Sequence, residues 1–171
     1  MEKINKEISF KNNPITVVGK MSRVGDIGEN FQSYNKEFEE VYLNDYNNKY
    51  KIISVVPSID TPVCATQTRK FNEKASEFDE VVILNISVDL PYALKRFCAA
   101  EGINNAVTLS DYKDLDFAKK YGFLIKELRL LTRGVLIMDK KNRIKYVEYV
   151  REITNYPDFE KALKELKKLI K

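Results

Sequence analysis

The chain has 171 residues, 44% of them hydrophobic and 32% charged, which fits one globular domain over residues 1–171 with a sizeable core. Its 29 Lys and Arg residues are interspersed with 25 Asp and Glu residues, and the net charge of +4 gives little support to a nucleic-acid or membrane partner. The absence of histidine excludes Cys-His and Ser-His catalysis and would leave a tetrahedral metal site dependent on carboxylates.

The first residues, 1–6, contain no apolar stretch of the kind found in secretory signals. No apolar run approaches the roughly 20 residues that cross a bilayer. We therefore expect a cytoplasmic protein. In a reducing cytosol two cysteines seldom form a structural disulfide, so Cys64 and Cys98 are candidates for chemistry.

The N-terminal part of the chain predicts short strands. Residues 4–10 and 15–18, separated by a turn at residues 12–14, favour a β-hairpin. Residues 25–49 are rich in loop formers, with short strands expected near Phe31 and over residues 41–43. A hairpin extension and a loop-rich connection therefore precede the regular part of the fold.

Strands and helices alternate from residue 51 onward. The expected strands cover residues 51–56, 81–88, 106–109, 134–138 and 144–150. The expected helices cover residues 62–78, 91–101, 115–121 and a last segment from about residue 157. Gly102 ends the second helix, and the last two strands pair across a turn at residues 139–142. The alternation implies βαβ units and the late hairpin adds antiparallel pairing, so we expect an α/β protein with a mixed sheet flanked by helices.

Cys64 lies at the start of the first of these helices. Thr61 is a good N-cap and Pro62 suits the first helical position, which places Cys64 at the third. Free backbone N–H groups and the positive end of the helix dipole stabilise a thiolate there. Residues 64, 68, 71, 75 and 78 recur at helical spacing and put Cys64 over the buried face. The alternative is a structural cysteine that packs as a small hydrophobic residue.

The residues around Cys64 resemble a known active site. Pro57, Thr61 and Cys64 match the P-x3-T-x2-C pattern of peroxiredoxins, and the string SIDTPVCATQTRKFN, residues 58–72, resembles the active-site segment of thiol peroxidases, the atypical two-cysteine peroxiredoxins. The resemblance extends over nearly the whole chain, through Cys98, Arg133 and the C-terminal helix. It implies a thioredoxin-like fold with an N-terminal β-hairpin extension, which the alternation of strands and helices also matches.

The resemblance implies a thiol-dependent peroxidase acting on hydrogen peroxide and organic hydroperoxides. The Cys64 thiolate attacks one peroxide oxygen, the O–O bond breaks, and water or an alcohol leaves, which produces a sulfenic acid without a metal or redox cofactor. Helix capping alone accounts for Thr61; the resemblance adds hydrogen bonds from its hydroxyl to the thiolate and a peroxide oxygen. Pro57 is expected to shape the loop and shield Cys64 from water.

Arg133 precedes the apolar run at residues 134–138. A lone arginine at a strand start is usually a surface residue. In thiol peroxidases, however, an arginine at this place lies beside the active-site cysteine, where it favours the thiolate and holds the peroxide. Arginine suits this role because it stays charged and offers several directed donors. Arg69, five residues after Cys64, is a weaker candidate that would face solvent if the helix is regular.

Cys98 lies 34 residues after Cys64, a spacing that matches neither a CxxC dithiol nor a zinc site. One interpretation is a buried cysteine near Phe97 and Ala99. The resemblance implies instead a resolving cysteine, whose thiol forms an intramolecular disulfide with Cys64 that a thioredoxin-like dithiol protein reduces. Disulfide geometry requires Cα atoms within about 7 Å, so one or both helices would partly unwind.

Two other functions use the same residues. A redox-sensing binding protein would present the Cys64–Cys98 disulfide to a partner, and the sequence distinguishes it poorly from an enzyme. A disulfide reductase or isomerase is weakened by the missing CxxC. Asp60 and Asp89 precede helices and are interpreted as capping or loop residues. The resemblance further suggests a homodimer and a preference for alkyl hydroperoxides.

Overall fold

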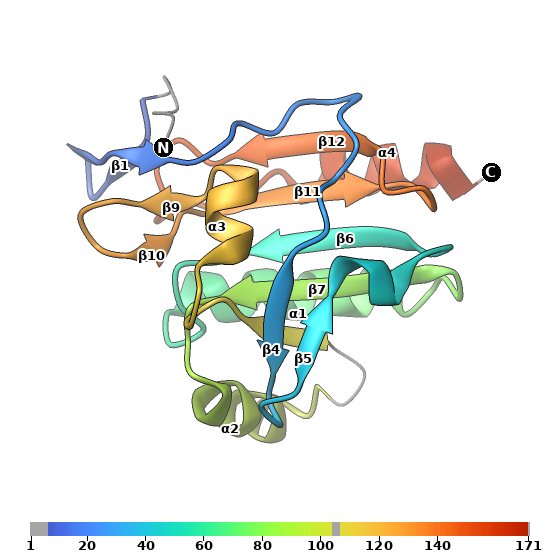
Figure 1. Cartoon of the computed structure of the whole chain (residues 1–171), viewed down its shortest axis with the longest axis horizontal. Helices are drawn as coiled ribbons and strands as arrows, with labels where there is room; N and C mark the ends of the chain where they lie inside the picture. Colours follow the sequence, from blue (N-terminus) through green and yellow to red (C-terminus); the bar gives the residue numbers. More distant parts are fainter. Residues whose placement is uncertain (1–6, 104–106, 171) are drawn as a thin grey trace.

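The computed structural model describes residues 7–103 and 107–170 and has a mixed central sheet with helices on both sides (Figure 1). Within these residues, seven strands form the sheet in the order β12 (Ile144–Tyr149), β11 (Gly134–Met138), β6 (Tyr50–Val55), β7 (Val81–Ser87), β8 (Val107–Ser110), β4 (Gln32–Asn35) and β5 (Glu40–Tyr42). The described helices are α1 (Pro62–Ala75), α2 (Pro91–Glu101), α3 (Asp116–Tyr121) and α4 (Phe159–Ile170), with a 3-10 turn at Leu43–Tyr46.

The strand directions confirm the predicted α/β class. Strands β6, β7 and β8 are parallel neighbours, joined by α1 and α2 as crossovers. Strand β11 pairs antiparallel with β6, and β12 pairs antiparallel with β11 across the expected turn. This mixed sheet flanked by helices is the thioredoxin-like arrangement that the sequence predicted.

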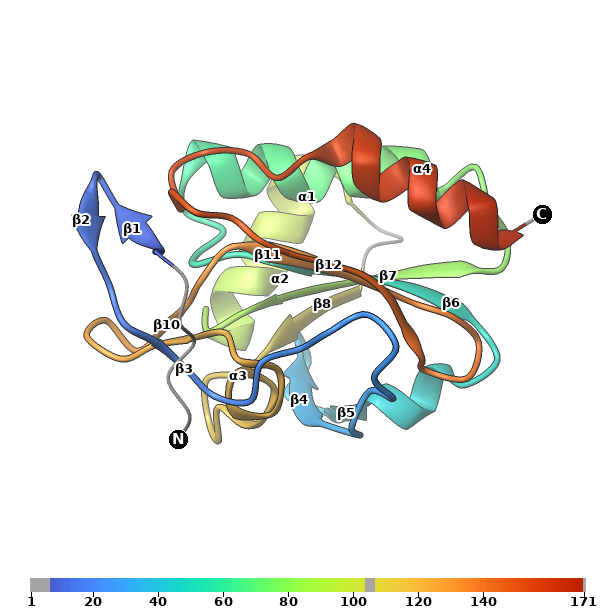
Figure 2. The ribbon, with the colours of Figure 1, turned by 90° about the horizontal axis from the view of Figure 1, so that it is seen from above.

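Two layers of helix and loop cover the sheet. Helices α1 and α4 lie on one face, whereas α3 and the loop-rich N-terminal segments lie on the other (Figure 2). The larger apolar cluster includes Phe31, Phe117 and Phe123, and a smaller one joins Phe71 of α1 to Leu166 of α4.

In the described part of the chain no helix has both the length and the apolar character needed to span a membrane.

The helix that carries Cys64 begins where the sequence predicted. The Thr61 hydroxyl accepts a hydrogen bond from the Cys64 N–H, and Pro62 occupies the first turn. Helix α1 ends at Ala75, short of the predicted residue 78, and Phe78 packs against the α1–α4 cluster from the following turn. Helix α2 matches its predicted bounds, and Gly102 ends it in the left-handed conformation with φ 66°.

The predicted N-terminal hairpin is present but shorter than expected. Strand β1 (Ser9–Phe10) pairs with β2 (Asn13–Pro14) across a turn with positive φ at Lys11 and Asn12, whereas residues 4–6 lie outside the described residues. The second arm was expected at residues 15–18, but it is β2 and extends only to Ile15, whose N–H donates to the Ile8 carbonyl at 3.0 Å. Strand β3 (Val17–Val18) pairs with β9 (Leu124–Ile125), which also pairs with β10 (Leu130–Leu131). The predicted strand at 106–109 is observed as β8, with Ala106 outside the described residues.

The hairpin is fastened to the segment that follows β12. The Ser9 N–H donates to the Arg151 carbonyl at 2.7 Å, and the Ile153 N–H donates to the Ser9 carbonyl at 3.0 Å. The Glu152 carboxylate accepts hydrogen bonds from the Ser9 hydroxyl at 2.9 Å and the Asn12 N–H at 2.7 Å. Partial burial opposes ionisation of Glu152, but these hydrogen bonds outweigh it and lower the pKa to about 2.

Replacing Glu152 by glutamine should make the stability of the chain less dependent on acid pH. Because the pKa of Glu152 falls from 4.5 to about 2 on folding, its carboxylate stabilises the wild-type protein above pH 4.5, and this contribution is lost as the pH falls toward 2. The difference in unfolding free energy between the wild type and Glu152→Gln should therefore shrink across that interval. Urea unfolding followed by circular dichroism measures it, and a difference that does not change with pH would contradict this role.

Candidate active site

Cys64 is fully buried, with no exposed surface, in the first turn of α1. Its N–H donates to the Thr61 hydroxyl at 3.2 Å, and its carbonyl accepts from the Thr68 hydroxyl at 3.0 Å. The side chain packs in a small apolar cluster formed by Val56, Ile59 and Leu94, with Ala93 and Phe97 at its edge. The sulfur therefore lies at a helix N-terminus and in an apolar pocket at once, and a molecule that reaches it must displace part of this cluster.

Arg133 lies beside this sulfur. It stands immediately before β11, which lies between β12 and β6 in the sheet, and is 2% exposed. Its Nη2 donates to Cys64 Sγ at 3.1 Å, its Nη1 donates to Gln67 Oε1 at 2.9 Å, and its Nε donates to the Ile153 carbonyl at 2.7 Å. The structure thus brings together Arg133, Cys64 and Thr61, which the sequence placed 72 residues apart at the most.

The charge of Arg133 gives this contact its chemical meaning. No ion pair to a carboxylate is found for Arg133 within residues 7–103 and 107–170, and its other two acceptors are neutral. A buried cation is costly unless an anion compensates it. The sulfur of Cys64 is the one of the three acceptors of Arg133 that can become an anion.

Gln67 is a functional candidate that the sequence analysis missed. It is fully buried one turn after Cys64, where its Oε1 accepts from Arg133 and its Nε2 donates to the Ser54 hydroxyl of β6 at 2.9 Å. Its amide therefore fixes the guanidinium between α1 and the sheet. The available signal was a polar residue at a position that shares the buried face of the helix with Cys64.

The loop before Cys64 is fixed from the side of α2. Pro57 is buried in this loop, two residues after the end of β6. Asp89, just before α2, accepts hydrogen bonds from the Ser58 hydroxyl and the Ile59 N–H, both at 2.8 Å. Asp89 was interpreted as a capping or loop residue. Its carboxylate in fact connects the segments that precede the two cysteine-bearing helices.

Cys98 lies on the inner face of α2, 2% exposed, and both cysteines are free thiols. Its sulfur contacts the Thr108 hydroxyl of β8 at 3.6 Å, within hydrogen-bond range for sulfur. Leu94, one turn earlier on α2, packs against Cys64. The face of α2 that packs against Cys64 at Leu94 therefore also carries Cys98, one turn closer to the end of the helix.

Two ion pairs on the outside join the same helices. Arg69 Nη1 lies 2.8 Å from Glu101 Oε2, which links α1 to the end of α2. Arg96 Nη2 lies 3.8 Å from Asp60 Oδ1, which links α2 to the loop before α1. Arg69 is thus directed to the outside of α1 and not toward the Cys64 sulfur. Exposed pairs of this kind contribute about 0–1 kcal/mol each.

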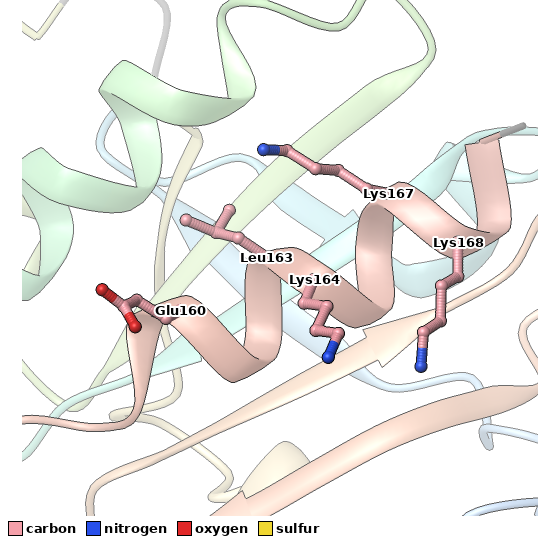
Figure 3. Close-up of a pocket in the computed structure, with 5 residues that line it drawn as sticks. All are labelled: Glu160, Leu163, Lys164, Lys167 and Lys168. Carbon is pink, nitrogen blue, oxygen red and sulfur yellow. The ribbon is translucent and has the colours of Figure 1, made fainter.

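A hollow of about 490 Å³ lies elsewhere, on the outer side of α4. Figure 3 shows the side chains that line it: Glu160, Leu163, Lys164, Lys167 and Lys168. None of them comes from the elements that hold Cys64 or Cys98. The lysines lie on the solvated side of an amphipathic helix whose Ala162 and Leu166 are buried against the sheet.

The comparisons with known proteins agree with this geometry. The sequence model of the Redoxin family matches residues 23–166. The thiol peroxidase of Listeria innocua is 54% identical over 95% of this chain and 98% of its own length. The thiol peroxidase of Staphylococcus epidermidis is 55% identical over 92% of this chain and 96% of its own length.

The fold has a close counterpart among solved structures. The crystal structure of a peroxiredoxin-like protein from Aquifex aeolicus superimposes with a TM-score of 0.90 at 36% identity and covers 99% of both chains. Identity near one half over almost the full length, together with a cysteine and an arginine in contact at the start of α1, leaves no other assignment of comparable support. The chain belongs to the Redoxin family and, within it, to the thiol peroxidases, which are peroxidase oxidoreductases.

Proposed function

We propose that this protein reduces hydrogen peroxide and alkyl hydroperoxides with Cys64 as the attacking thiolate and Cys98 as the resolving thiol. The single observation that carries the proposal is the 3.1 Å contact from Arg133 Nη2 to Cys64 Sγ in a fully buried site. Relatives named thiol peroxidases support the reaction class. The residue roles, the reductant and the cellular location belong to the proposal.

In the first step the Cys64 thiolate attacks the distal peroxide oxygen. The O–O bond breaks, the sulfur becomes a sulfenic acid, and the other oxygen leaves as water or an alcohol after taking up a proton. Charge develops on the leaving oxygen, so donors aimed at that position accelerate the step. Nη2 of Arg133 carries a second N–H for this purpose, and the Thr61 hydroxyl turns from the cap toward the peroxide.

Peroxide reaches Cys64 by displacing the groups that cover it. Ile59 and Leu94 pack against the thiol, and the loop that contains Pro57 and Ile59 is attached to Asp89. Local opening of this loop, or of the start of α2, exposes the sulfur. The apolar side chains suit the carbon chain of an organic hydroperoxide and exclude water from the thiolate.

In the second step Cys98 attacks the Cys64 sulfenic acid. The Cys98 thiol loses its proton, the new S–S bond forms, and the sulfenic oxygen leaves as water. Since both thiols are buried on different helices, α1 or α2 partly unwinds to bring the Cα atoms within about 7 Å. A thioredoxin-like dithiol protein then reduces the disulfide. We further propose that the enzyme works in the cytoplasm as a homodimer.

The variant Cys64→Ser should lose peroxidase activity. A serine hydroxyl is a weak nucleophile at neutral pH and forms no sulfenic acid, so consumption of cumene hydroperoxide in a thioredoxin-coupled assay should fall to the background rate. In a single-turnover measurement Cys98→Ser, which removes the other thiol of the chain, is the matched control, because it should still consume one equivalent of peroxide whereas Cys64→Ser should consume none. Normal turnover in Cys64→Ser would refute the assignment.

The variant Cys98→Ser should be oxidised once and then stop. With one equivalent of peroxide, intact mass and peptide mapping should show an oxygen adduct on Cys64, and excess peroxide should add further oxygen to the same sulfur. The wild type should lose two hydrogens and yield a linked Cys64–Cys98 peptide. If the wild type also stopped at the oxygen adduct on Cys64, Cys98 would not be a resolving thiol and would have only a structural role.

The variant Arg133→Lys should slow the first step although it keeps the charge. The single ammonium group of lysine cannot donate to Ile153, Gln67 and Cys64 at the same time, as the planar guanidinium does. The loss of one aligned donor costs about a hundredfold in rate. Rapid mixing with peroxide, followed by quenching and mass analysis, gives the rate of Cys64 oxidation. The exposed Arg69→Lys is the matched control and should stay within about twofold of the wild type. Equal rates of Cys64 oxidation in the wild type and both variants would show that Arg133 takes no part in the reaction.

A further inference from the structure

A row of buried polar side chains crosses the sheet beneath α1 and α2. Ser54 on β6, Asn85 on β7 and Thr108 on β8 are register partners of one another in adjacent parallel strands. Directly opposed residues share one face of a sheet, so the three side chains stand side by side. They are 0%, 4% and 3% exposed. Parallel strands buried on both faces normally carry apolar residues at such positions, which makes this row unusual.

One end of the row reaches the surroundings of Cys64. The Ser54 hydroxyl accepts a hydrogen bond from Gln67 Nε2 at 2.9 Å. The Oε1 of the same amide accepts from Arg133 Nη1, and Arg133 Nη2 donates to Cys64 Sγ. Ser54 on β6 is therefore connected to the attacking sulfur through two side chains.

The other end of the row reaches Cys98. The Thr108 hydroxyl lies 3.6 Å from the Cys98 sulfur, and the two groups can exchange donor and acceptor roles. Adjacent strands are about 4.8 Å apart, so β6 and β8 are separated by about 10 Å. Asn85 on β7 lies between the end of the row that contacts Cys98 and the end that is linked to Cys64, so it stands on the side of Thr108 that faces the Cys64 end.

The side chain of Asn85 can accept a further hydrogen bond at this place. Its Nδ2 donates to the Val107 carbonyl of β8 at 3.2 Å. Its Oδ1 is buried and has no hydrogen-bond partner among the described residues. A buried acceptor without a partner is destabilising, and an apolar β-branched residue would avoid the penalty at this strand position.

We propose that Asn85 is a positioning residue for disulfide formation. As α2 loosens, the Cys98 thiol leaves Thr108 and donates to Asn85 Oδ1, which holds its sulfur over β7 and toward Cys64. The thiol then gives up its proton, its sulfur is oxidised as it bonds to the Cys64 sulfur, and the sulfenic oxygen leaves as water. This inference rests on the proposed function, because it requires Cys98 to be the resolving thiol.

The isosteric pair Asn85→Val and Asn85→Thr tests the acceptor itself. Both side chains suit a strand and have the same shape, but only threonine keeps a hydroxyl that can accept from Cys98. The reduced full-length proteins are mixed with one equivalent of hydrogen peroxide, quenched and alkylated at successive times, and analysed by intact mass. The ratio of the disulfide to the Cys64 oxygen adduct gives the rate of the second step, with the rate of the first step measured in the same samples.

We expect Asn85→Val to form the disulfide about tenfold more slowly than the wild type and Asn85→Thr to recover to within about threefold, as for the loss and return of one hydrogen bond. Excess peroxide should correspondingly over-oxidise Cys64 more readily in the valine variant. Ile83→Val, on the same strand and face, is the control for a change in core packing and should match the wild type.

Equal rates in the valine and threonine variants would overturn the inference, because the acceptor would then make no difference. Should Asn85→Val fail to fold, the pair Asn85→Ala and Asn85→Ser makes the same comparison with less bulk. The wild-type measurement separates this inference from the proposed function. A wild type that forms no Cys64–Cys98 disulfide overturns both, whereas a wild type that forms it at the rate of the variants overturns the role of Asn85 alone.

Discussion

The guanidinium of Arg133 is buried and donates to three acceptors from two distant segments of the chain: the Ile153 carbonyl, the Gln67 amide and the Cys64 sulfur. Because taking a charge out of water is costly, each acceptor must be held in place by the surrounding fold. The start of strand β11 directs the arginine, the helix α1 carries two of the acceptors, and the segment after β12 supplies the third. The N-terminal hairpin contributes indirectly, since it is fastened to the same segment through Glu152.

The two cysteines are held by contacts of different strength. Cys64 is fixed by the helix cap, the apolar cluster and the buried guanidinium. The end of α2 that carries Cys98 is held by the packing of Phe97, one sulfur–hydroxyl contact and an exposed ion pair from Glu101. Exposed pairs contribute little to stability, and a thiol is a weak hydrogen-bonding group. This difference suits the proposed cycle, in which Cys64 stays in place as the attacking sulfur while the helix that carries Cys98 loosens and returns.

The sequence predicted the local features of the site and the order of its elements. The cap at Thr61, the depth of Cys64 on its helix and the end of α2 at Gly102 follow from residue types at fixed spacing, so they needed no tertiary information. The contact of Arg133 with Cys64 was foreseen only through the family resemblance, because residues 69 positions apart carry no local signal of proximity. The pairing of β3 with β9 was missed because two-residue strands have no period to detect.

The polar groups that orient the site could not be predicted for a related reason. Gln67 and Asp89 act through partners on other elements, and their types alone are compatible with surface or capping positions. The row formed by Ser54, Asn85 and Thr108 becomes visible only when the register of three strands is known. A single polar residue in an apolar strand therefore indicates a polar row only when the register of the neighbouring strands is known.

We propose, as the central point, that the buried guanidinium is compensated by a Cys64 thiolate in the reduced protein. The ultraviolet absorbance of thiolate in the fully reduced protein at neutral pH measures this directly. The account predicts the signal of one thiolate in the wild type and in Cys98→Ser, and its loss in Cys64→Ser. A wild type without a thiolate signal at neutral pH, or a signal that persists in Cys64→Ser, would contradict it.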